Sequence, residues 1–165
     1  MSHASLVLVA LVSTALAAGS AAVAQTAGQD VLAPPAAAAN PAAELAPGVT
    51  FKVTHLRRLP DKGVMELKFM VANASQADTS LKDLGLAYDH QLKDIPIIDF
   101  AGRKQYSVGQ AAHCLCSTFR EHDGGVVRAG AQREFWAWYG LPPMGARQLA
   151  IQVPDQQPIM NVPLM

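Results

Sequence analysis

The chain has 165 residues, and half of them are hydrophobic, so it can bury one ordinary core and is expected to form a single domain. Lysine and arginine together number 13, as do aspartate and glutamate, so the overall charge favours neither nucleic acid nor an acidic membrane surface as a partner. A nucleic-acid-binding function is therefore not expected.

The N-terminal arm is nearly free of charge and carries features of a signal peptide. Residues 5–18 form an apolar run, SLVLVALVSTALAA, that is too short to span a bilayer comfortably, and Ala22-Val23-Ala24 matches the small-x-small pattern of signal peptidase sites. The sequence therefore predicts a signal peptide at residues 1–24, cleavage after Ala24, and a periplasmic or secreted mature chain without a transmembrane segment. The positive residues that usually begin a signal peptide are absent, so a misassigned start and an uncleaved N-terminal anchor are the alternatives.

Residues 25–48 are built from alanine, proline and small polar residues, with few larger aliphatic side chains. Such a segment buries too little apolar surface to offset the entropy lost on ordering, and its prolines favour extended, solvated backbone. We predict a flexible Ala/Pro-rich linker here and a folded domain at residues 49–165.

Beyond residue 48 the dominant pattern has a period of two, as in half-buried strands. In VMELKFMV, residues 64–71, four apolar side chains share one face while Glu66 and Lys68 share the other. Turn signals rich in glycine, proline and asparagine separate further short apolar or alternating runs, at residues 50–54, 95–100, 104–108, 133–139, 147–153 and 158–164. Seven or eight short strands at this spacing predict an all-β, antiparallel β-sandwich.

Four segments carry a resemblance to a known family: IIDFAGRKQY (97–106), CLCSTF (114–119), RAGAQREFWAWYGLPP (128–143) and QVPDQQPIMNVPL (152–164). With them the chain resembles the uncharacterised immunoglobulin-like domains of bacterial envelope and secreted proteins, which in some relatives precede an OmpA-type peptidoglycan-binding domain. The resemblance implies an immunoglobulin-like β-sandwich and a location outside the cytoplasm. It implies no activity, and no OmpA-type domain is expected in this chain.

The stretch HCLCSTF, residues 113–119, holds the only two cysteines of the chain. On a regular strand Cys114 and Cys116 would point to one face and His113 to the other, and side chains two residues apart would be separated by about 6 to 7 Å. The Cβ atoms of a disulfide lie about 3.8 Å apart, so a bridge needs a bulge or a turn. Because the expected compartment is oxidising and neither thiol has a third partner, we expect a structural Cys114–Cys116 disulfide once the backbone bends.

Other functions stay open for the same stretch. Two soft thiolates with His113, His122 or a methionine would suit Cu(I) or zinc, although a lone C-x-C is a weak metal signal. A redox or nucleophilic role has less support, because the C-x-x-C spacing is absent and no base is identifiable.

The run REFWAWY, residues 133–139, is the second stretch of interest. On a strand, Glu134, Trp136 and Trp138 share one face, and the other aromatic side chains share the opposite face. Two exposed tryptophans would offer a platform for a glycan, a peptide or an envelope protein, and Glu134 on the same face favours partial exposure. The structural alternative packs one tryptophan in the core and shields the other with a loop.

No catalytic motif is present, since the chain has no paired-histidine metal motif, nucleophile elbow, P-loop or dinucleotide fingerprint. We therefore expect a non-enzymatic, secreted or periplasmic binding or envelope-associated module without a cofactor. The competing hypothesis is a periplasmic copper- or zinc-handling protein that uses Cys114 and Cys116 as ligands.

Overall fold

The computed structural model describes residues 41–120, 123 and 125–165. The predicted signal peptide, residues 25–40 of the predicted linker and His122 lie outside the described residues. Within the described ranges the fold is all-β, with no α-helix and with antiparallel pairing throughout. None of these residues belongs to a helix that is long and apolar enough to cross a membrane.

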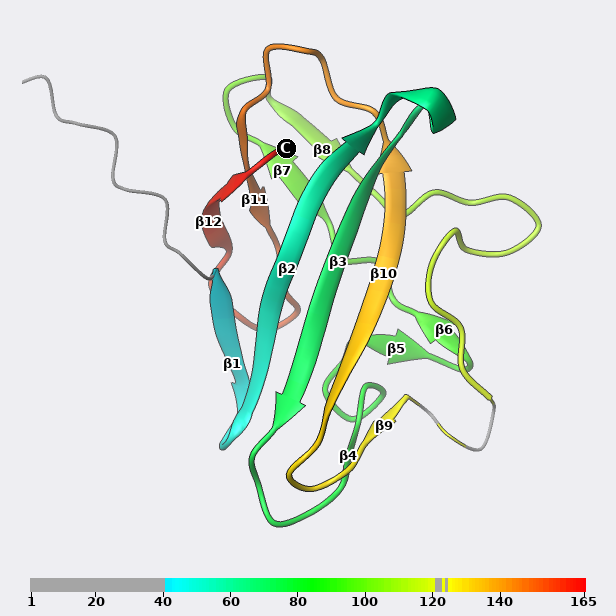
Figure 1. Cartoon of the computed structure of the whole chain (residues 1–165), viewed down its shortest axis with the longest axis vertical. Coiled ribbons are helices and arrows are strands. Elements are labelled where there is room, and N and C mark those ends of the chain that lie inside the picture. Colours follow the sequence, from blue (N-terminus) through cyan, green and yellow to red (C-terminus); the bar gives the residue numbers. More distant parts are fainter. Residues whose placement is uncertain (1–40, 121–122, 124) are drawn as a thin grey trace, which may run out of the picture. The chain divides into compact units, whose positions relative to one another are not determined.

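Four strands form the first sheet, in the order β1, β2, β3 and β10 (Figure 1). Their bounds are β1 Ala42–Ala46, β2 Val49–Leu59, β3 Val64–Asn73 and β10 Gln132–Gly140. A 3-10 turn, η1 (Pro60–Lys62), closes the long hairpin between β2 and β3. It ends at Gly63, whose φ of +66° lies in the left-handed region that glycine enters without strain.

Four shorter strands form the second sheet, in the order β12, β11, β7 and β8. Their bounds are β7 Ile97–Asp99, β8 Lys104–Tyr106, β11 Gln148–Ile151 and β12 Ile159–Pro163. Two short ladders complete the fold: β4 Thr79–Ser80 with β9 Val126–Val127, and β5 Ala87–Tyr88 with β6 Gln91–Leu92. The strands predicted from residue 64 onward are confirmed as β3, β7, β8, β10, β11 and β12.

The alternation in the sequence explains which side chains are buried. Every second residue of β3 is fully buried, beginning at Met65 and ending at Val71. β10 follows the same rule, with Phe135, Ala137 and Tyr139 buried. Because neighbouring residues of a strand point to opposite faces, each of these strands has one apolar and one mixed face.

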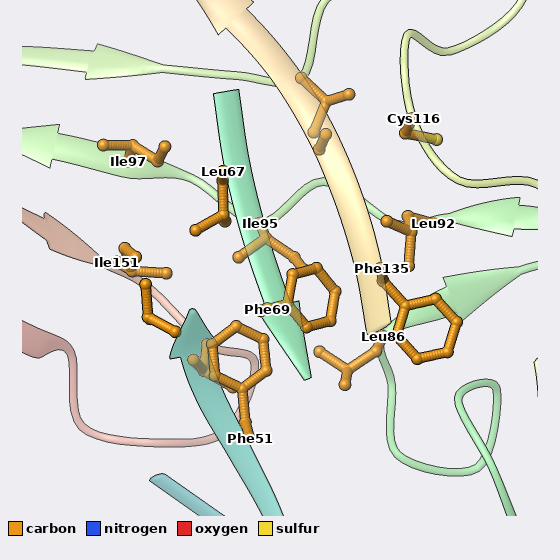
Figure 2. Close-up of a cluster of buried hydrophobic side chains, with 14 of the residues drawn as sticks. Phe51, Leu67, Phe69, Leu86, Leu92, Ile95, Ile97, Cys116, Phe135 and Ile151 are labelled. Atoms are coloured by element: carbon orange, nitrogen blue, oxygen red, sulfur yellow. The ribbon is translucent and has the colours of Figure 1, made fainter. Parts of the chain in front are cut away.

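One hydrophobic core is shared by the two sheets. Phe69 stacks on Phe51 of β2 and on Phe135 of β10, with ring centroids 4.5 and 5.6 Å apart. Figure 2 shows these rings together with Ile97 and Ile151, which come from the second sheet. Burial of each such side chain contributes about 1.5 to 3 kcal/mol, and this holds the sheets against each other. The arrangement is consistent with the predicted β-sandwich.

A β-bulge in β2 changes which of its residues face the core. The register shifts between Val53 and His55, so Thr54 is an extra residue opposite β3. Odd-numbered residues such as Val53 are buried before the bulge, and Leu56 is buried after it. Uniform alternation along β2 would have placed Leu56 on the outer face.

The bulge also directs Arg58 toward the loop between β10 and β11. Its guanidinium donates hydrogen bonds to the carbonyl oxygens of Pro142, Pro143 and Ala146, at 2.6, 2.7 and 2.8 Å. A planar guanidinium can serve three acceptors at once, so a single side chain holds this loop.

The boundary predicted between linker and domain is wrong. β1 lies inside the predicted linker of residues 25–48 and pairs with β2, and the amide of Val53 donates to the carbonyl oxygen of Pro41 at 2.9 Å. An alanine-rich strand carries little side-chain signal, because its stability comes from main-chain pairing with a neighbour. The folded part therefore includes residues from Pro41 onward and does not begin at Val49.

Candidate functional site

The outer surface of the first sheet carries both tryptophans. Because Phe135 and Tyr139 of β10 face the core, Trp136 and Trp138 face outward, where both are half-buried. Their ring centroids lie 5.4 Å apart, with the planes tilted by 50°. The structural alternative with one tryptophan in the core is therefore wrong, since other aromatic rings occupy the core positions of this strand.

Glu66 lies beside Trp138 and organises a polar network on this surface. The two residues are directly opposite each other across β3 and β10. The carboxylate accepts hydrogen bonds from Trp138 Nε1 at 3.1 Å and from Arg57 Nε at 2.9 Å, and His55 Nε2 lies 3.0 Å from the same oxygen as Arg57. Only 7% of Glu66 is exposed, although it points away from the core, because these neighbours cover it.

The network also sets the charge of Glu66. Burial alone would raise the pKa of this carboxyl, but the hydrogen bonds from His55, Trp138 and Arg57, together with the charge of Arg57, outweigh burial and lower the pKa from 4.5 to about 2. Glu66 is therefore ionised at neutral pH. The indole of Trp138 is held by a charge-assisted hydrogen bond, which is stronger than one between neutral groups.

Further charged side chains surround the tryptophans. Lys62 Nζ lies 4.6 Å from the ring centroid of Trp138, in cation–π contact. Lys68 of β3 and Glu134 of β10 form an exposed ion pair with 3.6 Å between nitrogen and oxygen. We call the following set the tryptophan face: Glu66, Lys68, Glu134, Trp136 and Trp138.

The cysteine segment runs along the edge of β10 that β3 does not occupy. The carbonyl oxygen of Leu115 accepts the amide of Trp138 at 2.8 Å, and the amide of Ser117 donates to the carbonyl oxygen of Trp136 at 2.8 Å. Ser117 Oγ also accepts the amide of Trp136, at 2.9 Å. The main-chain groups of both tryptophans are thus bonded to this segment, while β3 pairs with the opposite edge of β10.

Cys114 and Cys116 point from this segment into the core, where both are buried. Their Cα atoms lie 5.3 Å apart, and their Sγ atoms lie at disulfide-bonding distance. The backbone is bent at this point, as a bridge between these positions requires: Gln110 pairs with Cys114, and Cys116 pairs with Ala137 of β10.

The described part of the predicted metal site forms no cluster of three ligands. His113 is exposed, and His122 lies outside the described residues. In the part of the chain that the structure describes, no three His, Cys, Asp or Glu side chains gather as ligands of a metal ion. The two sulfur atoms lie at disulfide-bonding distance, and the copper or zinc hypothesis stays a prediction.

Sequence reasoning missed the residues that support the tryptophans. The alternation in β3 places Glu66 on the outer face, but its contact with Trp138 joins residues 72 positions apart and depends on the register between their strands. The bulge at Thr54 then brings His55 and Arg57 to that same face. No local signal in the sequence indicates either feature.

No protein-family model, curated protein or solved structure matches this chain. The strand order and the tryptophan face therefore carry the functional argument.

Proposed function

We propose that the chain is a secreted or periplasmic, non-enzymatic binding module, and that it contacts its ligand through the tryptophan face. The observation that carries this proposal is the pair of outward-facing tryptophans, 5.4 Å apart, with Trp138 held by the buried carboxylate of Glu66. Tryptophan offers a large, rigid contact area at low cost in conformational entropy. Supporting hydrogen bonds that fix a contact residue are what a preorganised site needs.

The strand order supports an immunoglobulin-like fold. β2, β3 and β10, with the cysteine segment beyond β10, correspond to strands A, B, E and D of such domains, and β12, β11, β7 and β8 correspond to G, F, C and C′. β1 is an additional strand before A. The chain departs from antibody domains in that its cysteines lie in the D-like segment and not in strands B and F.

One sequence feature and one structural feature support a location outside the cytoplasm. A signal peptide cleaved after Ala24 would export the chain, and a cysteine pair at bonding distance persists as a disulfide in oxidising compartments. In such a compartment the candidate ligands are an envelope protein, a peptide or a glycan. Immunoglobulin-like folds serve many functions, so the tryptophan face and not the fold carries the choice of a binding role.

Binding to two envelope fractions of the producing organism tests this proposal, one containing insoluble cell-wall glycan and the other solubilised envelope proteins. Trp136→Ala removes an outward ring without opening the core. Tyr88→Ala, which truncates an exposed aromatic side chain on β5, is the matched control. We expect Trp136→Ala to lower the affinity at least about tenfold, as truncation of aromatic contact residues does, and Tyr88→Ala to leave it unchanged.

Digestion of the bound fraction identifies the ligand class. Loss of binding after protease treatment assigns a protein or peptide, and loss after glycan hydrolase treatment assigns a glycan. The proposal is wrong if the parent protein binds neither fraction, or if Trp136→Ala binds as well as the parent.

A further inference from the structure

Exposed apolar side chains gather at one end of the domain, on two loops that share no residue with the tryptophan face. Phe100, in the turn between β7 and β8, is 59% exposed, and Met144, in the loop between β10 and β11, is 82% exposed. A cavity of about 360 Å³ opens between the two loops, with Phe100, Arg147 and Met160 in its lining. Figure 1 shows both loops at the same end of the two sheets. We call residues 100–104 and 143–147 together the loop end.

Cations accompany these apolar side chains, although the whole chain is neutral. Arg103 follows Phe100 in the same turn, Lys104 begins β8 directly after it, and Arg147 lies in the other loop; all three are exposed. Residues 100–104 and 143–147 contain no acid. The adjacent Asp99, at the end of β7, is buried and accepts a hydrogen bond from the amide of Gly102 at 2.8 Å. The turn η1, at the same end of the first sheet, adds one charge of each sign, from Asp61 and Lys62. The loop end therefore carries a local excess of positive charge.

Both loops are held in place by hydrogen bonds. Asp99 caps the β7–β8 turn through Gly102, and Arg58 donates to three carbonyl oxygens of the β10–β11 loop. Exposed apolar side chains on supported loops cannot fold back into the core to lower their exposure. A single exposed apolar residue needs no explanation. Several exposed apolar residues at one end of a domain, beside a cavity, indicate an interaction surface.

We propose that the loop end docks on an anionic lipid surface, with Phe100 and Met144 inserted among the lipids and Arg103, Lys104 and Arg147 on the headgroup phosphates. Apolar side chains at loop tips, with cations behind them, match the two layers of a membrane interface, in which acyl chains lie beneath negative headgroups. Each Lys or Arg near such a surface contributes about fivefold to the partition coefficient. The cavity beside Arg147 leaves room for part of one lipid.

Co-sedimentation with vesicles tests this docking surface, using the protein in its processed form and vesicles of phosphatidylcholine with or without phosphatidylglycerol. We expect binding to the vesicles that contain phosphatidylglycerol, weakened about 25-fold by Arg103→Gln/Lys104→Gln. The control Lys82→Gln/Lys93→Gln removes the same charge from exposed positions on other loops and should change binding less than about twofold. Phe100→Ser/Met144→Ser, which leaves the charge unchanged, should weaken binding about tenfold.

Hydrogen exchange in the presence of the vesicles locates the contact independently of any binding by the N-terminal residues. Protection of residues 100–104 and 143–147 supports the proposal, and protection confined to other segments overturns it. The absence of binding to the anionic vesicles, or an equal loss in the Lys82→Gln/Lys93→Gln control, also overturns it. These outcomes are separate from those for the tryptophan face, because Trp136→Ala should bind the vesicles as the parent does.

Discussion

Replacing Glu66 with glutamine keeps the shape of the side chain and removes its charge. In the folded chain the pKa of Glu66 is lowered from 4.5 to about 2. Each unit by which the pKa of a group differs between the folded and unfolded states corresponds to about 1.4 kcal/mol of stability. The ionised carboxylate therefore adds about 3 kcal/mol to the free energy of unfolding at neutral pH.

The sign of the pH dependence follows from the lowered pKa. Because the folded chain releases this proton at lower pH than the unfolded chain, the contribution is complete above about pH 5 and is lost as the pH falls toward 2. We expect Glu66→Gln to be less stable than the parent by about 3 kcal/mol at pH 7, by about 1.4 kcal/mol at pH 3 and by less than about 0.5 kcal/mol at pH 2.

Urea unfolding followed by far-ultraviolet circular dichroism measures these differences without relying on the tryptophans. Glu134→Gln is the matched control, because Glu134 is an exposed carboxylate on the same face whose ion pair with Lys68 is worth less than about 1 kcal/mol. A Glu66→Gln deficit that stays the same from pH 7 to pH 3 would refute the reasoning, since the loss would then come from shape and not from charge.

Three further predictions concern the cysteine pair, the β10–β11 loop and one glycine. Intact mass should show the purified protein to be lighter by about two hydrogens than its reduced form, and free thiols in the native protein would contradict the disulfide. Urea unfolding should show that Cys114→Ser/Cys116→Ser lowers the free energy of unfolding by about 1.5 kcal/mol, because so small a loop restricts the unfolded chain little. Arg58→Lys should lower the free energy of unfolding by about 2 kcal/mol and speed hydrogen exchange in the β10–β11 loop, because an ammonium cannot reach three carbonyl oxygens together. Unchanged exchange in that loop would argue against this role of Arg58. Gly125→Ala should lower the melting temperature more than Gly130→Ala, since both have positive φ (+71° and +72°) but only at Gly125 would a Cβ lie 3.0 Å from a buried leucine.

Strands with one apolar and one polar face could be predicted from the sequence because their period is a property of the local chain. β3 alternates from Met65 to Val71 without interruption, and the same holds for β10 around Trp136. The bent backbone at the cysteines could also be anticipated, because two side chains on a regular strand are too far apart to bridge.

Features that depend on pairing between distant segments could not be predicted. β1 is built mostly from alanine and resembles a linker until β2 is present to pair with it. The contact between Glu66 and Trp138 requires the register of β3 and β10, and a shift of one residue would place Trp138 against a different side chain. The bulge at Thr54 carries no marker of its own, yet it decides that Arg58 reaches a loop.

The longest strand in the described part of the chain, β2, has neither edge free. β3 pairs with one edge. On the other edge, β1 and Pro41 pair with β2 as far as Val53, and Met165 exchanges main-chain hydrogen bonds with Leu56 and Arg58 at 3.0 and 2.7 Å. An uncovered strand of this length would invite strands from other molecules. Loss of the main-chain pairing at Met165 would therefore open this edge of β2 to strands of other molecules, although the side chain of Met165 is exposed and contributes little to the core.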